Sequence, residues 1–358
     1  MALSRITLAD FRNHAETTLD GARPINLLLG PNGAGKTNVL EALSLLAPGR
    51  GLRRAQLADM ARRCGSGGFA IGASLGSGDA VRLGTFVEPS ASGRRRVRIN
   101  AAESSAAALG EWLSVSWLTP AMDGLFAAAA SDRRRYLDRL ALALAPDHAR
   151  HAGRYEQALR ERNRLLADDR APDARWLDAI ELQMATSGSA LAEGRAALVD
   201  ALMGEIVRHG EAPFPRPALS YAPGGPMGEA QFSQALHDGR ARDRAAGRTL
   251  TGPHRDDLLV SYAAKRIPAA ASSTGEQKAL LIAMTLAHAT LASRGRPALL
   301  LLDEVAAHLD PARRAALFSR LADSGTQVWV TGTESAPFEG LVRDCACWEV
   351  TDGAVVRR

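Results

Sequence analysis

The spacing of apolar residues changes several times along the chain, and each change predicts a different kind of element. Short apolar or alternating runs predict strands at residues 5–11, 25–29, 69–75, 80–86, 96–100, 257–262, 298–302 and 328–331. Apolar residues three or four positions apart predict several helices over residues 111–210 and another at 279–291. Strands on both sides of a helix-rich middle indicate an α/β fold with a second, helical lobe.

The helix-rich middle suggests how the chain divides. We expect one lobe from residues 1–110 and 245–358, and a mainly helical second lobe from residues 111–244. Five prolines between positions 213 and 226 end the helical pattern and mark a loop. The closely spaced strands at residues 69–100 predict an antiparallel β layer. Heptads are not sustained, so we expect no long coiled coil.

A phosphate-binding pattern lies between the predicted strand at 25–29 and a predicted helix. Its sequence is Gly30-Pro31-Asn32-Gly33-Ala34-Gly35-Lys36-Thr37, followed by Asn38, which fits G-x-x-x-x-G-K-[ST]. The glycines let backbone N–H groups turn toward phosphate oxygens, and the helix N-terminus adds partial positive charge. We expect Lys36 to reach the β- and γ-phosphates and Thr37 to bind Mg²⁺. The alternative is a glycine-rich turn that binds nothing.

Two acids follow the apolar run at residues 298–302. A buried strand that ends in carboxylates is what a Walker B element needs. We expect Asp303 to hold Mg²⁺, through water, and Glu304 to polarise the attacking water, so that Glu304 and Lys36 are the catalytic residues. Many strands end in an acid, and the position downstream of the glycine-rich loop favours the functional interpretation.

A third motif opens the predicted helix at 279–291. Ser273 and Glu276 fit a capping box, which explains the motif structurally. The segment also lies 30 residues before Asp303, separated by one helix, and there it resembles the signature motif of ABC-type ATPases. The matching residues are Ser273, Thr274, Gly275 and Glu276. Asp310, after Leu309, resembles the D-loop residue.

The resemblance to ABC-type ATPases implies a head-to-tail homodimer with two ATP molecules at its interface. In that superfamily the signature residues of one subunit cap the ATP of the other. Where transporters carry a switch histidine, this chain has Thr331-Gly332-Thr333, and no Q-loop glutamine stands out. Arg12 and Asn13 touch the nucleotide in related heads; here a strand-ending turn explains them equally well.

The spacing of the motifs separates the branches of this superfamily. Lys36 and Ser273 are 237 residues apart, more than in transport ATPases, and no long coiled coil fills the gap as it does in SMC-like heads. The short helical lobe is similar to that of the RecF family of bacterial recombination mediators. Local matches are Leu8-Ala9-Asp10-Phe11-Arg12-Asn13, residues 30–43, Pro48-Gly49-Arg50-Gly51-Leu52-Arg53, Leu118-Thr119-Pro120, Arg133-Arg134-Arg135-Tyr136-Leu137-Asp138 and, most specifically, Thr251-Gly252-Pro253-His254-Arg255-Asp256-Asp257-Leu258.

The resemblance to RecF implies an ATP-dependent DNA-binding protein of recombinational repair and replication restart. ATP would drive a clamp onto DNA at gaps or single-strand/double-strand junctions, and slow hydrolysis would reset it. A RecR-type mediator would be a partner in loading recombinase, with a role in the SOS response. The alternatives are the motor subunit of an ABC transporter, which would ignore DNA, and a chromosome-organising head.

The charge of the chain agrees with a nucleic-acid partner. Net charge is +5 and the isoelectric point is about 9.5. Clustered arginines suit sequence-independent phosphate binding. The expected DNA contacts are Arg50, Arg53, Arg54, Arg133, Arg134 and Arg135, with His254 and Arg255, which could instead orient the signature region. No apolar run could cross a membrane, no signal peptide stands out, and three cysteines lack zinc spacing, so we expect a cytoplasmic protein.

Overall fold

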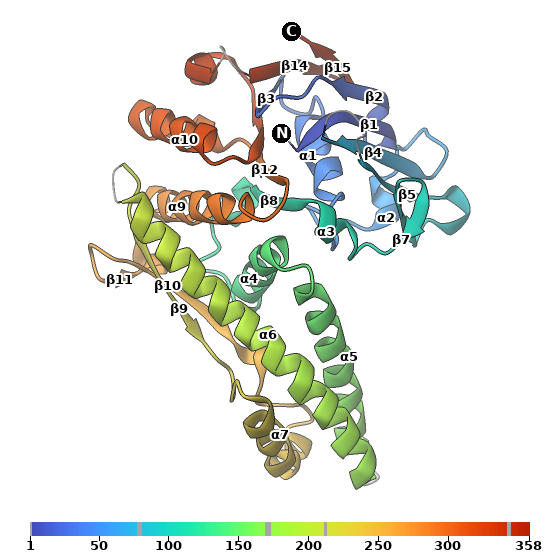
Figure 1. Ribbon diagram of the computed structural model, residues 1–358, viewed down its shortest axis with the longest axis vertical. Coiled ribbons are helices and arrows are strands. Elements are labelled where there is room, and N and C mark those ends of the chain that lie inside the picture. The colour runs from blue at the N-terminus through green and yellow to red at the C-terminus, as the bar shows by residue number, and fades with distance from the viewer. Residues whose placement is uncertain (1, 77–80, 169–172, 211–212, 342–344) are drawn as a thin grey trace. The chain divides into compact units, whose positions relative to one another are not determined.

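The computed structural model describes residues 2–76, 81–168, 173–210, 213–341 and 345–358 (Figure 1). The chain separates into two compact units. The first unit contains Met1–Asp123, Glu211–Phe214 and Leu281–Arg358, and the second contains Gly124–Gly210 and Pro215–Leu280. The lobe boundaries predicted from the sequence, at residues 111 and 245, stay a prediction about functional lobes. No described helix is both long and apolar enough to cross a membrane.

A mostly parallel sheet forms the centre of the first unit. Its strand order is β15 (Ala354–Arg357), β14 (Cys345–Thr351), β3 (Ile25–Leu29), β13 (Gln327–Gly332), β12 (Ala298–Leu302) and β8 (Ser114–Leu118). Only the β14–β15 pair is antiparallel. The central strands are buried along their whole length, which explains why their sequences are mostly apolar. Parallel pairing brings the carboxyl ends of β3, β13 and β12 to one edge.

An antiparallel sheet forms a second layer of the first unit, as the sequence predicts. Its order is β2 (His14–Asp20), β1 (Leu3–Phe11), β4 (Phe69–Leu75), β5 (Val81–Val87), β6 (Arg95–Ile99) and β7 (Ala102–Ser104). One apolar core joins the two sheets and includes Ile6, Ile71, Leu28 and the stacked pair Trp329 and Trp348. The helices of this unit are α1 (Lys36–Ser44), α2 (Leu57–Met60), α3 (Leu109–Trp112) and α10 (Pro311–Asp323). Helix α9 (Thr274–Ala292) continues across the division at residue 280.

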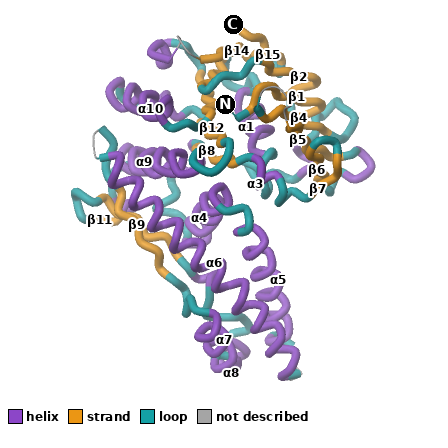
Figure 2. Tube along the Cα trace, viewed as in Figure 1, coloured by secondary structure: helices purple, strands orange, loops and turns teal. Residues whose placement is uncertain are grey.

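The second unit is mainly helical, and within its described residues it holds no long coiled coil (Figure 2). Its helices are α4 (Ala130–Leu144), α5 (His148–Leu166), α6 (Ala174–His209), α7 (Glu229–Asp238) and α8 (Arg240–Ala245). They accompany a small sheet of β11 (Ile267–Pro268), β10 (Asp257–Tyr262) and β9 (Pro217–Ala222). The proline-rich segment, predicted to be a loop, therefore contains an edge strand. Pro217 is the first residue of β9, a position where a missing N–H is tolerated.

Two buried arginines connect the elements of the second unit. Arg162 of α5 has no exposed surface and bonds Glu181 at 2.9 Å and Asp243 at 2.7 Å. Arg195 of α6 bonds Asp138 at 2.8 Å and Asp256 at 2.7 Å. In each case carboxylates replace the hydration that burial removes from the guanidinium group. Asp256 belongs to the 251–258 motif, so this motif is built into the interior of the unit.

Candidate nucleotide site

The glycine-rich loop occupies the turn between β3 and α1, as predicted. Backbone φ is positive at Gly30, Gly33 and Gly35, with values of 155°, 83° and 114°. A Cβ added to Gly30 would lie 2.1 Å from the carbonyl oxygen of Val350, so a side chain cannot fit there. A Cβ on Gly33 would meet no atom within 4 Å, and its strain would come from φ alone. The loop is thus closed against β14 at Gly30 and open at Gly33, where a phosphate can approach.

Lys36 begins α1 and is buried beneath the loop. Its Nζ donates to the carbonyl oxygens of Gly30 at 2.7 Å and Pro31 at 2.9 Å. An ammonium has three donors, so a third remains for a phosphate oxygen. Burial lowers the pKa of Lys36, and the nearby carboxylates of Glu304 and Asp303 oppose that shift. The charge of Lys36 is thus balanced in part by the two acids that follow β12.

Thr37 joins the glycine-rich loop to the acids. Its Oγ1 donates to Oδ1 of Asp303 at 2.9 Å, although the two residues are 266 positions apart. A hydroxyl and a carboxylate are the hard oxygen ligands that Mg²⁺ prefers, and Mg²⁺ bound with phosphates needs few protein ligands. The described residues contain no group of three or more His, Cys, Asp or Glu arranged for a metal. A site of one hydroxyl and one carboxylate, completed by phosphate and water, fits this arrangement.

Glu304 follows Asp303 at the carboxyl edge of the sheet. Its backbone is left-handed, with φ of 52°, which is uncommon for a residue with a side chain. Its N–H donates to Oγ1 of Thr331 at 2.9 Å. Glu304, Thr331 and Asn32 share the wall of a cavity of about 210 Å³. This cavity has room for a water molecule next to Glu304, as a general base requires.

Arg12 and Asn13 contact the glycine-rich loop and its helix. The Arg12 guanidinium makes two bonds of 2.8 Å to the buried carboxylate of Glu41 and one of 2.7 Å to the carbonyl oxygen of Asp59. Asn13 Nδ2 donates to the carbonyl oxygen of Ala34 at 3.0 Å, and Asn13 Oδ1 accepts from Nδ2 of Asn38 at 2.7 Å. Arg12 also has a positive φ of 57°, typical of a strand-ending turn. These contacts favour a supporting role, while direct nucleotide contact stays a prediction.

The signature residues lie at the N-terminus of α9, in the second unit. Glu276 N donates to Oγ of Ser273 at 3.4 Å, and Ser273 N donates to Oε2 of Glu276 at 3.0 Å, so the capping box is present. Lys265 pairs with Glu276 at 2.5 Å and lowers the pKa of that carboxyl. Ser273, Thr274 and Gly275 are exposed. The cap leaves these residues accessible to a second molecule, and their contact with ATP in trans stays a prediction.

Asp310 has a structural role that the sequence did not separate from the D-loop resemblance. It is the N-cap of α10, and its side chain accepts from the backbone N–H of Arg313 at 2.9 Å. An N-cap aspartate stabilises the first turn of a helix. Its contact across a dimer stays a prediction.

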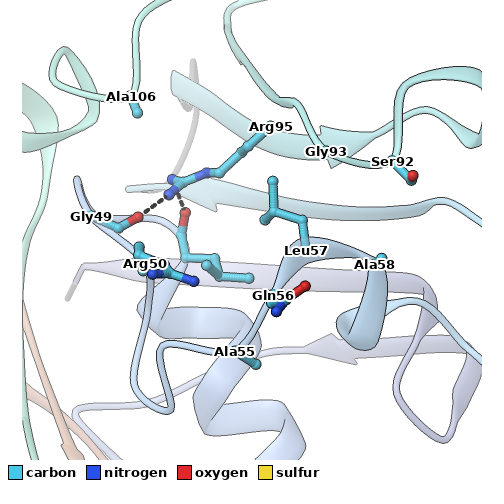
Figure 3. Close-up of a pocket in the computed structure, with 11 residues that line it drawn as sticks. Gly49, Arg50, Ala55, Gln56, Leu57, Ala58, Ser92, Gly93, Arg95 and Ala106 are labelled. Atoms are coloured by element: carbon cyan, nitrogen blue, oxygen red, sulfur yellow. Dashed lines mark hydrogen bonds between the residues drawn. The ribbon is translucent and has the colours of Figure 1, made fainter.

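The first arginine cluster is partly free to meet DNA. Arg50 and Arg54 are exposed, whereas Arg53 bonds Oδ1 of Asn38 at 2.8 Å and Glu41 at 3.2 Å. Arg50 lines a cavity of about 510 Å³ in the first unit (Figure 3). Beside it, Arg95 donates to the carbonyl oxygens of Leu45, Ala47 and Gly49 and so fixes the turn that carries Arg50. The Arg53 bonds connect this basic turn to α1.

The second arginine cluster is mostly engaged within its own unit. Arg133 makes two bonds to Asp257, of 2.8 Å and 2.7 Å, which raise its pKa. Arg134 donates to the carbonyl oxygen of Asp256 at 2.7 Å, and Arg135 pairs with the neighbouring Asp132. Charges already paired in this way add less to phosphate binding than free ones.

His254 is also engaged. Its Nε2 donates to the carbonyl oxygen of Thr249 at 3.0 Å, which leaves Nδ1 as the acceptor of the Tyr155 hydroxyl at 2.7 Å. Burial lowers the pKa of His254, so the neutral ring is the favoured form. Arg255, next to it, is exposed. The two hydrogen bonds give His254 a structural role within the second unit, and both a DNA contact and orientation of the signature region stay predictions.

Two residues of the site escaped the sequence analysis. His14 is buried below the loop, with Nε2 3.2 Å from the carbonyl oxygen of Gly35 and Nδ1 2.8 Å from that of Gly353. Gly353 N in turn donates to the carbonyl oxygen of Ala34 at 2.9 Å. The C-terminal hairpin therefore supports the loop. The second residue is Glu41, which accepts from Arg12. These partners of His14 and Glu41 are too distant in sequence to leave a local pattern.

A parallel sheet that carries a glycine-rich loop and two acids, joined to an antiparallel layer, defines the class of ABC-type ATPase heads. A family model, "RecF/RecN/SMC N terminal domain", matches residues 2–350. The chain belongs to the RecF family. It is 50% identical over 369 residues to the DNA replication and repair protein RecF of Mesorhizobium japonicum, with 99% of this chain and 97% of that protein covered. RecF of Brucella suis is 48% identical, with 99% and 95% covered.

Solved structures agree with the fold. A structure described as the recombination mediator protein RecF-ATP in the RecFOR pathway superposes with a TM-score of 0.87 at 21% identity, covering 100% of this chain and 97% of that one. An Smc head domain from Pyrococcus furiosus, bound to the C-terminal domain of ScpA, gives 0.56 at 14% identity, with 100% and 96% covered. These similarities confirm the predicted ATPase-head fold. The extended coiled coil of that Smc head structure has no counterpart among the helices of the described residues.

Proposed function

We propose that the protein is an ATP-dependent DNA-binding protein of recombinational repair and replication restart. The hydrogen bond between Thr37 and Asp303 carries the proposal, because it joins a phosphate-binding loop to a buried acid beside Glu304. The relatives named above are DNA replication and repair proteins, and a RecF of the same fold has been solved with ATP. Neither finding favours the alternative of a transporter motor.

The residues of the site suggest how ATP would be used. Backbone N–H groups of the loop and Lys36 hold the phosphates, and Thr37 and Asp303 hold Mg²⁺. When bound, Mg²⁺ neutralises charge on the phosphate oxygens. Glu304 orients and polarises a water in the adjacent cavity. We expect a weak ATPase in which slow hydrolysis acts as a conformational switch.

The signature residues support an ATP-dependent homodimer. Ser273, Thr274 and Gly275 are exposed at the N-terminus of a 19-residue helix, whose partial positive charge suits a γ-phosphate. A head-to-tail partner would bring them to the ATP of this chain, with Glu276 and Asp310 at the same interface. ATP then holds the dimer together, and hydrolysis releases it.

The basic surface of the first unit suits duplex DNA and single-strand/double-strand junctions without sequence preference. Arg50 and Arg54 are exposed on one turn, and Arg53 of that turn bonds α1. We expect these residues to contribute more than Arg133, Arg134 and Arg135, whose charges are already bonded. A RecR-type mediator is the expected protein partner in recombinase loading and the SOS response, and the cytoplasm is the expected location.

Sedimentation velocity of Glu304→Gln with Mg-ATP, with and without gapped duplex DNA, tests the proposal. Blocked hydrolysis should trap a dimer that co-sediments with the DNA. Ser273→Arg in the same background is the matched control, and it should bind ATP but stay monomeric. A Glu304→Gln protein that binds ATP, stays monomeric and ignores DNA would refute the clamp.

A further inference from the structure

Thr331 is a polar residue in an apolar strand. It lies near the carboxyl end of β13, with no exposed surface, after Val328, Trp329 and Val330. Strand β13 pairs with β3 on one side and β12 on the other, so Thr331 lies between the glycine-rich loop and the two acids. A buried hydroxyl is costly unless it is hydrogen-bonded, so its partners are informative.

The hydroxyl of Thr331 makes two hydrogen bonds whose directions are fixed by chemistry. Its Oγ1 donates to Oδ1 of Asp303 at 2.9 Å, because a carboxylate can only accept. The same Oγ1 accepts the backbone N–H of Glu304 at 2.9 Å, because an N–H can only donate. One side chain therefore bonds the expected Mg²⁺ residue and the backbone of the expected general base.

Glu304 needs such support. Its φ of 52° lies in the left-handed region, which is strained for a residue with a Cβ. Strain of this kind persists where surrounding contacts hold it, and it is common at active sites. The bond from Glu304 N to Thr331 is such a contact. Glu304 and Thr331 also line the same cavity of about 210 Å³.

We propose that Thr331 is a positioning residue for ATP hydrolysis. Its hydroxyl holds the backbone of Glu304 in the left-handed conformation while it is itself held by Asp303. The general base is thereby fixed relative to the expected Mg²⁺ ligand by a threonine, in the region where transporters carry a switch histidine. This inference rests on the proposed ATPase function.

The test compares three variants of the full-length protein. Thr331→Val removes the hydroxyl and keeps the shape, Thr331→Ser keeps the hydroxyl, and Thr326→Val is the matched control. Thr326 is buried in the same unit, and its hydroxyl donates to the carbonyl oxygen of Ala289 at 3.0 Å, away from the site. ATP affinity by fluorescent-nucleotide titration, single-turnover hydrolysis and hydrogen exchange of the Glu304 amide are measured for each.

Thr331→Val should bind ATP normally but hydrolyse it about 100-fold more slowly, at the low end of what a general base contributes. Its Glu304 amide should exchange faster. Thr331→Ser should restore both properties, and Thr326→Val should change neither. Because Thr331 acts through Glu304, Thr331→Val should add little further loss in a Glu304→Gln background.

Three results would overturn the inference in distinguishable ways. If wild type hydrolyses ATP and Thr331→Val is as active as Thr326→Val, the positioning role is refuted while the proposed function stands. If wild type bound to DNA hydrolyses no ATP, the proposed ATPase and the inference fall together. Fully additive losses in the double variant would show that Thr331 acts on something other than Glu304.

Discussion

Replacing Arg12 by alanine should destabilise the first unit far more than a surface mutation would. The change leaves Glu41 buried, with no exposed side-chain surface and only the weaker Arg53 contact at 3.2 Å. Removing one partner of a buried ion pair costs about 3–5 kcal/mol. Arg12 retains 20% side-chain exposure, so we expect the low end of that range, about 3 kcal/mol. Arg53→Ala, at a side chain 43% exposed, should cost less than about 1 kcal/mol.

The chain offers a clean optical assay for this prediction. Of its five tryptophans, only Trp176 belongs to the second unit. In a Trp176→Phe background, tryptophan fluorescence in a urea titration reports the unfolding of the first unit alone. The free energy of unfolding is then compared for Arg12→Ala, Arg53→Ala and the double variant Arg12→Ala/Glu41→Leu.

The double variant tests whether the unpaired carboxylate of Glu41 causes the loss of stability in Arg12→Ala. If the cost comes from a stranded carboxylate, then replacing Glu41 by leucine should recover much of the loss, because an apolar side chain needs no partner. ATP affinity of the same variant tells whether Arg12 touches nucleotide: recovered binding means that Arg12 acts through α1. An Arg12→Ala protein as stable as Arg53→Ala would refute the reasoning.

Three further predictions follow from the site and the units. Lys36→Arg should fold normally but lose productive ATP use, and wild-type hydrolysis by this variant would contradict the role given to the loop. Arg50→Ala/Arg54→Ala should weaken DNA binding and reduce the slope of log affinity against log salt by about two, whereas an unchanged slope would place the DNA elsewhere. His254→Gln should flatten the fall in thermal stability between pH 7 and pH 5. Because the pKa of His254 is lowered in the folded state, the neutral ring stabilises the fold above the unfolded pKa of 6.5, and this stabilisation is lost as pH falls. A pH profile that is the same in wild type and His254→Gln would contradict the prediction.

Local patterns were sufficient for the parts of the fold that depend on neighbours in sequence. The strand at 25–29, the loop after it and the strand at 298–302 were predicted because turn chemistry and unbroken apolar runs are local signals. Strand β8 was missed because it is a five-residue strand next to a helical pattern, and its place in the sheet depends on pairing with β12. Strand β9 was hidden by its first residue, Pro217, and by the prolines on either side of it, which usually indicate a loop.

The arginine clusters are a second case in which the sequence alone was not sufficient. The sequence presents Arg50, Arg53 and Arg54 in the same way as Arg133, Arg134 and Arg135. In the structure the second set is bonded to Asp257, the Asp256 carbonyl and Asp132. Arg133 and Arg134 are thus held by partners more than a hundred residues away, Asp257 and the Asp256 carbonyl oxygen, which a local pattern of charge does not include.

The register of two strands explains why Thr331 could not be assigned a role from the sequence. Leu302 of β12 pairs with Val330 of β13, so the next residues, Asp303 and Thr331, lie side by side. A slip of one residue would turn Thr331 to the other face and leave the Glu304 N–H without its acceptor. The sequence shows only Thr331-Gly332-Thr333 in the region where transporters carry a switch histidine. The pairing shows that Thr331 faces the acids, where its hydroxyl accepts the backbone N–H of Glu304 and donates to Asp303.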